Sequence, residues 1–275
     1  MQRSSWNHTA LAEYKSALFL FLKIMTGPVY IDEIFNSIQG EGIFTGVRQV
    51  FVRFMGCPLN CGYCDTSHSR LPAAPVCKVE RIPGTGEFMD IPNPVDMDTL
   101  VRIIGELWSP ATRHLSLTGG EPLTQTDCII ELSRYPDHPL YLETNSCLPD
   151  EARKVQYVVD VAACDVKLPE HKATEDYQSL LEAELETVGI FFDAGAFTFA
   201  KCVVTDRTSG NDLDIIARGL SDIDVTLPLV LQPVTSCPGF EPPASKRLLE
   251  LMDGAGEYLK DVRAVPQVHK MMGQL

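Results

Sequence analysis

Residues 49–66 read Gln-Val-Phe-Val-Arg-Phe-Met-Gly-Cys-Pro-Leu-Asn-Cys-Gly-Tyr-Cys-Asp-Thr, and this stretch decides the fold. Its first part, Gln49–Phe54, alternates apolar and polar residues in the manner of a β-strand. Its second part holds Cys57, Cys61 and Cys64 in the spacing C-x3-C-x2-C. A reactive loop at the carboxyl end of a strand is typical of the active sites of α/β barrels. The stretch therefore indicates an α/β fold with its chemistry at the strand ends.

The rest of the chain alternates between strand and helix patterns. Regular alternation predicts parallel strands joined by right-handed crossovers. About six strand-helix units fit, which is too few to close an eight-unit barrel. We therefore expect a partial, open β/α barrel with parallel strands. The expected strands are 29–35, 49–54, 113–117, 140–143, 157–161, 197–204 and 227–232, and the expected helices are 98–108, 126–134, 173–187, 212–220 and 245–252.

The 275 residues, 45% of them hydrophobic, can form one large domain, which we expect at 28–275. Within it, residues 67–96 are rich in Pro and Gly and predict an irregular insertion with room for one short hairpin. Residues 1–27 are expected to be an N-terminal extension. Its apolar run 16–25 is too short to span a bilayer, and no small-x-small cleavage site follows it. We interpret it as an added amphipathic helix or as the product of an upstream start codon, with Met25 beginning the protein.

The balance of charge excludes one class of partner. The formal net charge is -14 at pH 7. Tight binding to a phosphate backbone requires clustered Lys and Arg, so we expect no nucleic-acid partner. The acidic residues are interpreted as a solubilising surface. No membrane partner is expected either.

The cysteine motif allows more than one kind of site. Three thiolates within eight residues can bind one face of an iron-sulfur cube and leave the fourth iron open to a ligand. Zinc is an alternative if His68 supplies a fourth ligand, although no second short-spaced pair follows. A plain electron carrier is another. A disulfide scaffold is disfavoured, because nine cysteines in 275 residues are too dilute and their number is odd.

The spacing of the three cysteines, with Tyr63 just before the last, resembles the signature of the radical S-adenosylmethionine superfamily. The resemblance implies a [4Fe-4S] cluster whose open iron binds the amino and carboxylate groups of S-adenosylmethionine. Residues 118–122, Thr-Gly-Gly-Glu-Pro, are similar to the superfamily segment whose backbone holds that amino group. A glycine lets the main chain approach a ligand closely, and Glu121 can pair with an ammonium group. Alone, this string would be a common strand-to-helix turn.

A second set of motifs includes the run Ile-Gln-Gly-Glu-Gly at 38–42. The segments are 33–42, 51–57, 64–66, 143–146, 165–169, 232–233 and 266–270. They resemble a narrower family, the 7-carboxy-7-deazaguanine synthases, and the resemblance runs from about residue 28 to the end. It implies conversion of 6-carboxy-5,6,7,8-tetrahydropterin into 7-carboxy-7-deazaguanine with loss of ammonia. A glycyl-radical activase shares the cysteine spacing and is the nearest rival, but it should lack the run at 38–42.

The narrower resemblance also implies roles for single residues. Arg53 would bind the substrate carboxylate through its planar fork of donors, although an ordinary ion pair is the plainer interpretation. Thr66 would help to coordinate Mg²⁺, although alone it would be read as a helix cap. The substrate would contact Ile38, Gln39, Gly40, Arg53, Thr118 and Leu275. S-adenosylmethionine would contact Tyr63, Cys64, Asp65, Gly120, Glu121, Asp165, Val166, Lys167, Gln232, Pro233, Val234 and Thr235.

Some positions depart from the pattern. Family members often carry Ser-Pro-Lys where this chain has Asp165-Val166-Lys167, and Val234 and Thr235 match by position alone. The resemblance further implies an external electron donor of the flavodoxin or ferredoxin type, a homodimer and a cytoplasmic location. The homodimer rests on family analogy only.

Overall fold

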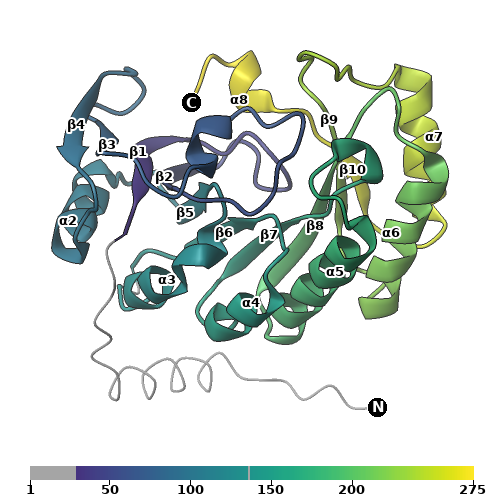
Figure 1. Cartoon of the computed structure of the whole chain (residues 1–275), viewed down its shortest axis with the longest axis horizontal. Coiled ribbons are helices and arrows are strands. Elements are labelled where there is room, and N and C mark those ends of the chain that lie inside the picture. The colour runs from purple at the N-terminus through teal and green to yellow at the C-terminus, as the bar shows by residue number, and fades with distance from the viewer. Residues whose placement is uncertain (1–28, 136) are drawn as a thin grey trace.

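The computed structural model describes residues 29–135 and 137–275, and a single mixed sheet of ten strands runs through them (Figure 1). The order of the strands is β10-β9-β8-β7-β6-β5-β2-β1-β3-β4. β10 and β4 lie at the two edges and do not pair with each other, so the barrel is open, as predicted. The strands are β1 Ile31–Ile38, β2 Arg48–Phe54, β3 Val76–Glu80, β4 Phe88–Pro92, β5 His114–Gly119, β6 Leu140–Thr144, β7 Val161–Asp165, β8 Phe197–Val204, β9 Leu229–Pro233 and β10 Val262–Ala264.

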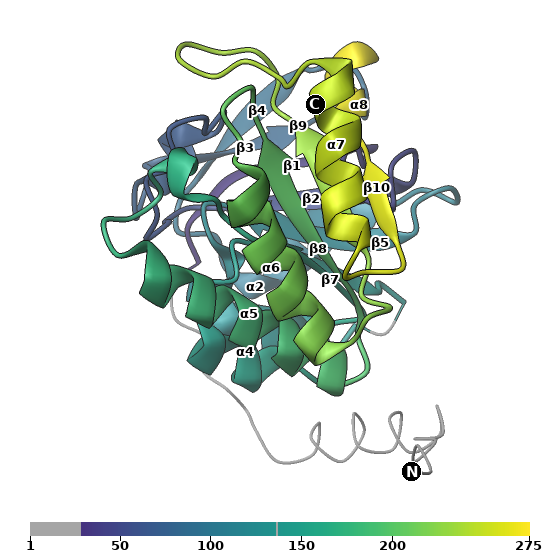
Figure 2. The same ribbon diagram turned by 90° about the vertical axis from the view of Figure 1, so that its right-hand side faces the viewer.

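The strands from β2 through β5, β6, β7, β8 and β9 to β10 all pair in parallel, which confirms the predicted core of the barrel. Helices connect them, and α3 to α7 cover the outer face of the sheet (Figures 1 and 2). None of the helices in the described part of the chain combines the length and apolar character needed to cross a membrane. The helices are η1 Ser67–Arg70, α2 Met97–Leu107, η2 Pro122–Gln125, α3 Thr126–Leu132, α4 Pro149–Val155, η3 Pro169–His171, α5 Tyr177–Asp193, α6 Gly210–Ile223, α7 Ser245–Gly256 and α8 Val268–Met271.

The central parallel strands are buried on both faces, because helices cover the outer face and the inner face is turned to the interior of the barrel. Side chains alternate along each strand: Leu140 and Leu142 of β6 belong to the large core under the helices. Tyr141, between them, belongs to a smaller cluster on the other face with Phe199 and Val230. The smaller cluster supports the inner face of the sheet, where the chain can form a cavity.

The structure differs from the sequence-based expectation at several elements. A strand was expected at 157–161, but β7 is Val161–Asp165, because the apolar Val158 and Val159 are buried from a turn after α4 instead. The helix expected at 173–187 begins after its cap Asp176, whose side chain accepts a hydrogen bond from Ser179 N. The short helices α4 and α8 and the edge strand β10 were not expected.

The insertion at 67–96 contains the expected hairpin, formed by β3 and β4. It is less irregular than predicted, since β3 pairs with β1 and the hairpin extends the main sheet. β1 itself runs antiparallel to β2, so this edge of the sheet is mixed. The N-terminal extension predicted for 1–27 lies outside the described residues.

The packing of the outer helices can be tested with two identical substitutions. Leu213 of α6 is fully buried in the main core, whereas Leu249 of α7 is 60% exposed. We expect Leu213→Ala to lower the free energy of unfolding by about 2–5 kcal/mol, because it removes transfer energy and leaves a cavity. Leu249→Ala should change it by less than about 1 kcal/mol. Urea unfolding followed by circular dichroism measures both, and equal losses would contradict this helix register.

Candidate active site

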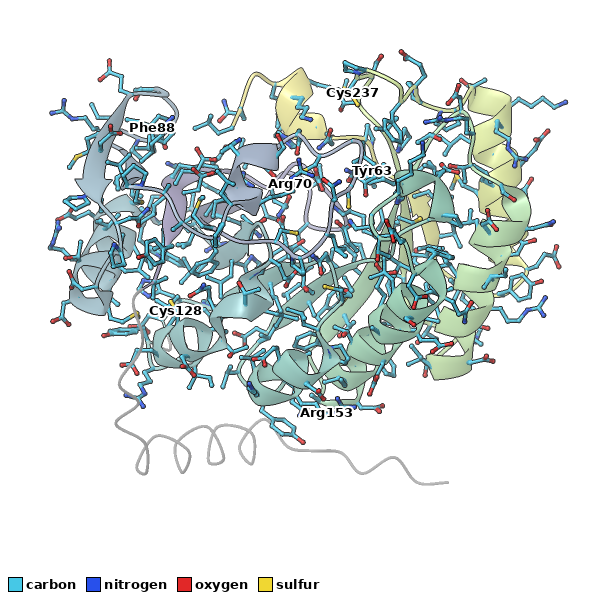
Figure 3. All side chains as sticks on the ribbon, viewed as in Figure 1. Tyr63, Arg70, Phe88, Cys128, Arg153 and Cys237 are labelled. Atoms are coloured by element: carbon cyan, nitrogen blue, oxygen red, sulfur yellow. The ribbon has the colours of Figure 1, made fainter. Side chains whose placement is uncertain are left out.

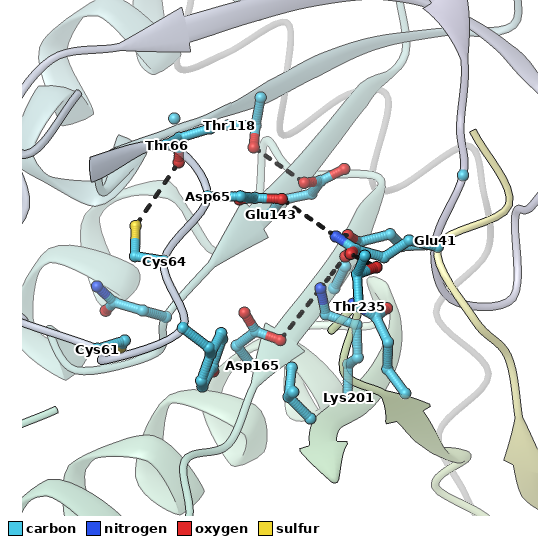
Figure 4. Close-up of a pocket in the computed structure, with 18 of the residues that line it drawn as sticks. Glu41, Cys61, Cys64, Asp65, Thr66, Thr118, Glu143, Asp165, Lys201 and Thr235 are labelled. Carbon is cyan, nitrogen blue, oxygen red and sulfur yellow. Dashed lines mark hydrogen bonds and ion pairs between the residues drawn. The ribbon is translucent and has the colours of Figure 1, made fainter. Parts of the chain in front are cut away.

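A cavity of about 540 Å³ opens at the carboxyl ends of the parallel strands. Its walls come from the last residues of β5, β6, β7 and β9, from the cysteine loop after β2, and from the segment around α8 (Figure 4). Figure 3 shows Tyr63 and Cys237 at this end of the molecule, with Cys128 and Arg153 towards the opposite end. This is the place where α/β barrels position catalytic groups.

The cysteine loop is fixed by backbone hydrogen bonds on two sides. Gly56 N donates to Ser69 O at 2.8 Å, on the segment that follows the loop. Gly62 N donates to His171 O at 2.9 Å, on the segment that follows β7. His171 is itself buried and held through both ring nitrogens. The loop conformation is therefore set by the surrounding fold.

All three thiols of the motif, Cys57, Cys61 and Cys64, are partly exposed and line the cavity. Within the described residues, no three His, Cys, Asp or Glu side chains converge closely enough to hold a single metal ion. A [4Fe-4S] cluster spreads its ligands, since each thiolate binds a different iron. Three separated sulfurs around one cavity thus fit such a cluster better than they fit a zinc ion.

Two glycines after β5 bring the backbone close to the cysteine loop. A Cβ at Gly120 would lie 2.1 Å from Gly56 O, and a Cβ at Gly119 would lie 2.4 Å from Phe54 N. Gly119 also has a φ of 119°, which other residues rarely adopt. Only glycine fits at these positions, and the half-buried backbone of both residues forms one wall of the cavity.

A buried ion-pair network crosses the cavity floor. Lys167 Nζ lies 3.0 Å from Asp165 Oδ2, and Lys201 Nζ lies 3.3 Å from Asp165 Oδ1 and also pairs with Glu41. Burial would raise the pKa of Asp165, but Lys167 and Lys201 together hold it below its usual value. Burial likewise opposes the charge of Lys167, yet attraction to Asp165 and Tyr63 raises its pKa well above the usual value. The network is therefore fully ionised near neutral pH.

A second polar group contains Glu143, a carboxyl whose pKa is raised rather than lowered. Glu143 Oε1 accepts a hydrogen bond from Gln39 Nε2 at 2.6 Å, and Glu143 Oε2 accepts one from Thr118 Oγ1 at 2.9 Å (Figure 4). Burial raises the pKa of Glu143 above its usual value, despite the nearby charge of Lys201. These three residues come from the loop after β1 and from the ends of two adjacent strands, so they can contact one planar ligand together.

Arg53 points into the same cavity from β2. Its Nε donates to Glu33 Oε1 at 2.8 Å, and the guanidinium lies 5.9 Å from the centre of the Phe35 ring. Among the described residues, this bond leaves the two terminal nitrogens of Arg53 without a hydrogen-bonding partner. The arrangement can present two parallel donors to an anion.

The segment around α8 covers one side of the cavity. Val268 N donates to Gly40 O at 2.9 Å, and a Cβ at Gly40 would lie 1.9 Å from His269 Nδ1. Lys270 Nζ bonds Asp65 Oδ2 at 2.6 Å, so the segment is attached to the cysteine loop as well. Ser37 Oγ donates to Leu275 O at 3.2 Å, which brings Leu275 to the cavity.

The cavity gathers most of the residues that the sequence singled out. Glu121, Val166 and Pro233 do not line it. Val166 is buried in the main core, and both carboxylate oxygens of Glu121 accept hydrogen bonds from protein groups. The predicted residues that line the cavity are Ile38, Gln39, Gly40, Arg53, Cys57, Cys61, Tyr63, Cys64, Asp65, Thr66, Thr118, Gly120, Asp165, Lys167, Gln232, Val234, Thr235 and Leu275.

Several polar residues of the cavity received no role from the sequence, among them Glu41, Glu143, Asn145 and Lys201. Glu41, Glu143 and Asn145 stand in two of the matched segments, so the signal was present but unassigned. Lys201 lies within β8 and has no motif around it. Its position becomes clear only from the strand register, which pairs Lys201 with Asp165. In addition, Gln232 Oε1 is buried at the cavity without a hydrogen-bond partner in the described residues, and is free to accept one from a ligand.

The buried carboxyl of Glu121 predicts a pH dependence of stability. Burial raises its pKa from 4.5 to about 7, against the lowering effect of the hydrogen bond from Leu123 N. The neutral form of Glu121 therefore stabilises the fold fully below pH 4.5. This stabilisation is lost as the pH rises through about 7, and the free energy of unfolding falls by about 3 kcal/mol.

In Glu121→Gln this loss should be absent. Urea unfolding from pH 4.5 to 8 should therefore show a flatter profile for Glu121→Gln than for the wild type. Glu182→Gln, an exposed control on α5, should follow the wild type. Parallel profiles for all three proteins would contradict the prediction, because they would mean that ionisation of Glu121 does not lower the free energy of unfolding.

Comparisons with known proteins identify the family. The model of the radical SAM superfamily matches residues 51–220. The 7-carboxy-7-deazaguanine synthase of Methanocaldococcus jannaschii is 38% identical over 252 residues, which cover 89% of this chain and 100% of that protein. The enzyme of the same name from Methanothermobacter thermautotrophicus is 37% identical, over 91% of this chain and 98% of that protein.

Solved structures agree on the fold. The crystal structure of QueE from Escherichia coli superposes with a TM-score of 0.53 at 20% identity, covering 96% of this chain and 100% of that chain. A radical SAM methyltransferase from Sphaerobacter thermophilus gives a TM-score of 0.54 at 11% identity, covering 92% of this chain and 84% of that chain. At such identities these structures support the fold alone. The sequence relatives show the family as well: the chain belongs to the 7-carboxy-7-deazaguanine synthase family of the radical SAM superfamily.

Proposed function

We propose that this protein converts 6-carboxy-5,6,7,8-tetrahydropterin into 7-carboxy-7-deazaguanine, a ring contraction that releases ammonia. One observation carries the proposal. The three cysteines of the cluster motif and the group formed by Gln39, Thr118 and Glu143 face the same cavity. A radical generated at the cluster would therefore arise beside a site built for a planar, polar molecule. The protein is a lyase that uses a [4Fe-4S] cluster and S-adenosylmethionine.

The cofactors supply the hard chemistry: when bound and reduced, the cluster cleaves S-adenosylmethionine to give the radical that starts the reaction. The protein holds the reactants together. We propose that Cys57, Cys61 and Cys64 bind the cluster, one thiolate to each of three irons. The cavity contains the side chains of all three, and Cys237, which also lines it, lies outside the motif.

S-adenosylmethionine is proposed to lie between the cluster and the ends of β5, β7 and β9. Its ammonium group can bind the backbone beside Gly120, where the close approach to Gly56 leaves room only for glycine. Its ribose hydroxyls can bond to Asp165 and to Gln232, whose Oε1 is unpaired and buried. Tyr63, held by Lys167 Nζ at 3.2 Å, forms the side wall. The direct contact predicted for Glu121 stays a prediction, since its carboxyl faces protein donors.

The pterin is proposed to lie on the opposite side, against Gln39 and Thr118. Glu143 accepts hydrogen bonds from both and can accept further ones from the amino and ring N–H groups of a pterin. Burial raises the pKa of Glu143 above its usual value. Arg53 can bind the substrate carboxylate through its terminal nitrogens. Fixing both reactants in one orientation supplies much of the rate acceleration.

Several finer assignments belong to the proposal. Mg²⁺ is proposed to bind at Thr66, whose hydroxyl lines the cavity 3.9 Å from Cys64 Sγ. The electron comes from a flavodoxin or ferredoxin, the protein is a homodimer, and it acts in the cytoplasm, where oxidants are scarce. Residues 28–275 form the catalytic domain, and the family resemblance supports each of these points.

The decisive experiment supplies the anaerobically reconstituted protein with reductant, Mg²⁺, S-adenosylmethionine and 6-carboxytetrahydropterin. Mass spectrometry should detect 7-carboxy-7-deazaguanine in amounts above the enzyme concentration. Cleavage of S-adenosylmethionine without that product would keep the protein in the superfamily and exclude this reaction.

The role of Arg53 gives a sharper prediction. Arg53→Lys keeps the charge and loses the planar pair of donors, so we expect kcat/KM for the pterin to fall about 10- to 100-fold, mainly through KM. Arg102→Lys is the matched control, because Arg102 is exposed on α2 and pairs with Glu106. Steady-state kinetics under anaerobic conditions measures both variants. An unchanged KM in Arg53→Lys would remove Arg53 from the substrate site.

A further inference from the structure

A chain of hydrogen bonds leads from a buried carboxyl to one of the cluster cysteines. Glu121 Oε2 accepts a hydrogen bond from Asn145 N at 2.7 Å. The side chain of Asn145 then reaches into the cavity, where its Nδ2 lies 3.4 Å from Cys57 Sγ. Glu121 is fully buried and Asn145 is 9% exposed.

The orientation of the Asn145 amide is fixed by its other hydrogen bond. Its Oδ1 accepts a hydrogen bond from the backbone of Cys147, two residues later, at 3.1 Å. This bond closes an Asx turn. With the oxygen turned to Cys147, the nitrogen is the atom that faces Cys57. An amide nitrogen can only donate, so the contact is an N–H···S hydrogen bond.

The turn that carries Asn145 is strained and held in place. Ser146 has a φ of 61°, a conformation that residues other than glycine seldom adopt. Ser146 N donates to Thr144 Oγ1 at 2.9 Å, and that hydroxyl donates to Glu121 Oε1 at 2.7 Å. Such strain persists only where the surroundings determine it, and it tends to occur at functional sites.

We propose that Asn145 tunes the reduction potential of the iron-sulfur cluster through its hydrogen bond to the Cys57 thiolate, with Glu121 as the residue that positions it. A reduced cluster carries one more negative charge, part of it on the sulfurs. A donor beside a sulfur stabilises the reduced form more than the oxidised form and makes the cluster easier to reduce. This inference rests on the proposed function only for the presence of the cluster.

The potential can be measured without substrate. The holoprotein with its [4Fe-4S] cluster, free of pterin and S-adenosylmethionine, is titrated with reductant and followed by electron paramagnetic resonance. Asn145→Leu keeps the size of the side chain and removes the donor. We expect its equilibrium constant for one-electron reduction to fall about two- to tenfold, where tenfold corresponds to a midpoint about 59 mV lower.

The matched control is Asn60→Leu, the same change within the cysteine loop. Asn60 is exposed, its side chain accepts a hydrogen bond from Arg70, and within the described residues no hydrogen bond joins that side chain to a sulfur. Its potential should equal that of the wild type. An Asn145→Leu protein that holds a full cluster at the wild-type potential, or an equal shift in both variants, would overturn the proposal.

Two further measurements decide the matter if Asn145→Leu fails to hold its cluster. Asn145→Asp keeps the shape and places a carboxylate beside the sulfur, so its potential should also fall, and an unchanged potential counts against the proposal. In the wild type, ¹⁵N in asparagine side chains should couple magnetically to the reduced cluster, and absence of coupling counts against it. All these readouts are independent of product formation, so failure of the pterin reaction would leave this test intact.

Discussion

The register of the parallel strands is the constraint on which the site depends. Adjacent parallel strands end at the same edge of the sheet, so the last inward-facing residue of each meets the last of its neighbours. Thr118, Glu143, Asp165 and Gln232 reach the cavity in this way. Asp165 of β7 pairs with Lys201 of β8, and a slip of β7 by one residue would turn the Asp165 side chain to the opposite face of the sheet.

Positive and negative side chains are nearly balanced in number in the cavity. Some form ion pairs, and Glu143 is held mainly by hydrogen bonds. The pairs formed by Lys167 and Lys201 with Asp165 and Glu41 stay ionised, because each buried charge has an opposite partner. Glu143 instead has mainly hydrogen-bonding partners, and its pKa is raised. Breaking one partner of the ionised network would leave a buried charge uncompensated, which costs far more than the net value of the pair. A site of this kind holds its dipoles fixed before any ligand arrives.

Much of the fold and of the site could be predicted from sequence, for physical reasons that differ by element. The strands β2 and β8 have alternating side chains and clear ends, and both were placed closely. β7 was placed too early, because Val158 and Val159 look like strand residues but are buried from a turn. Cys57, Cys61 and Cys64 could be found because their spacing places all three on one short loop and resembles a known family motif. Lys201 and the contact between Asn145 and Cys57 could not, since they depend on strand register and on the strained turn at Ser146.

The contacts of α8 with the loop after β1 join parts of the chain that are far apart in sequence. Gln267 Nε2 bonds Glu41 Oε1 across 226 positions, and Lys270 bonds Asp65 of the cysteine loop. During synthesis the three cysteines leave the ribosome long before α8 does. A nascent chain that has emerged through β9 therefore presents its thiols with one wall of the cavity still missing. Docking of the last segment then closes that side of the cavity and narrows the access to the thiols.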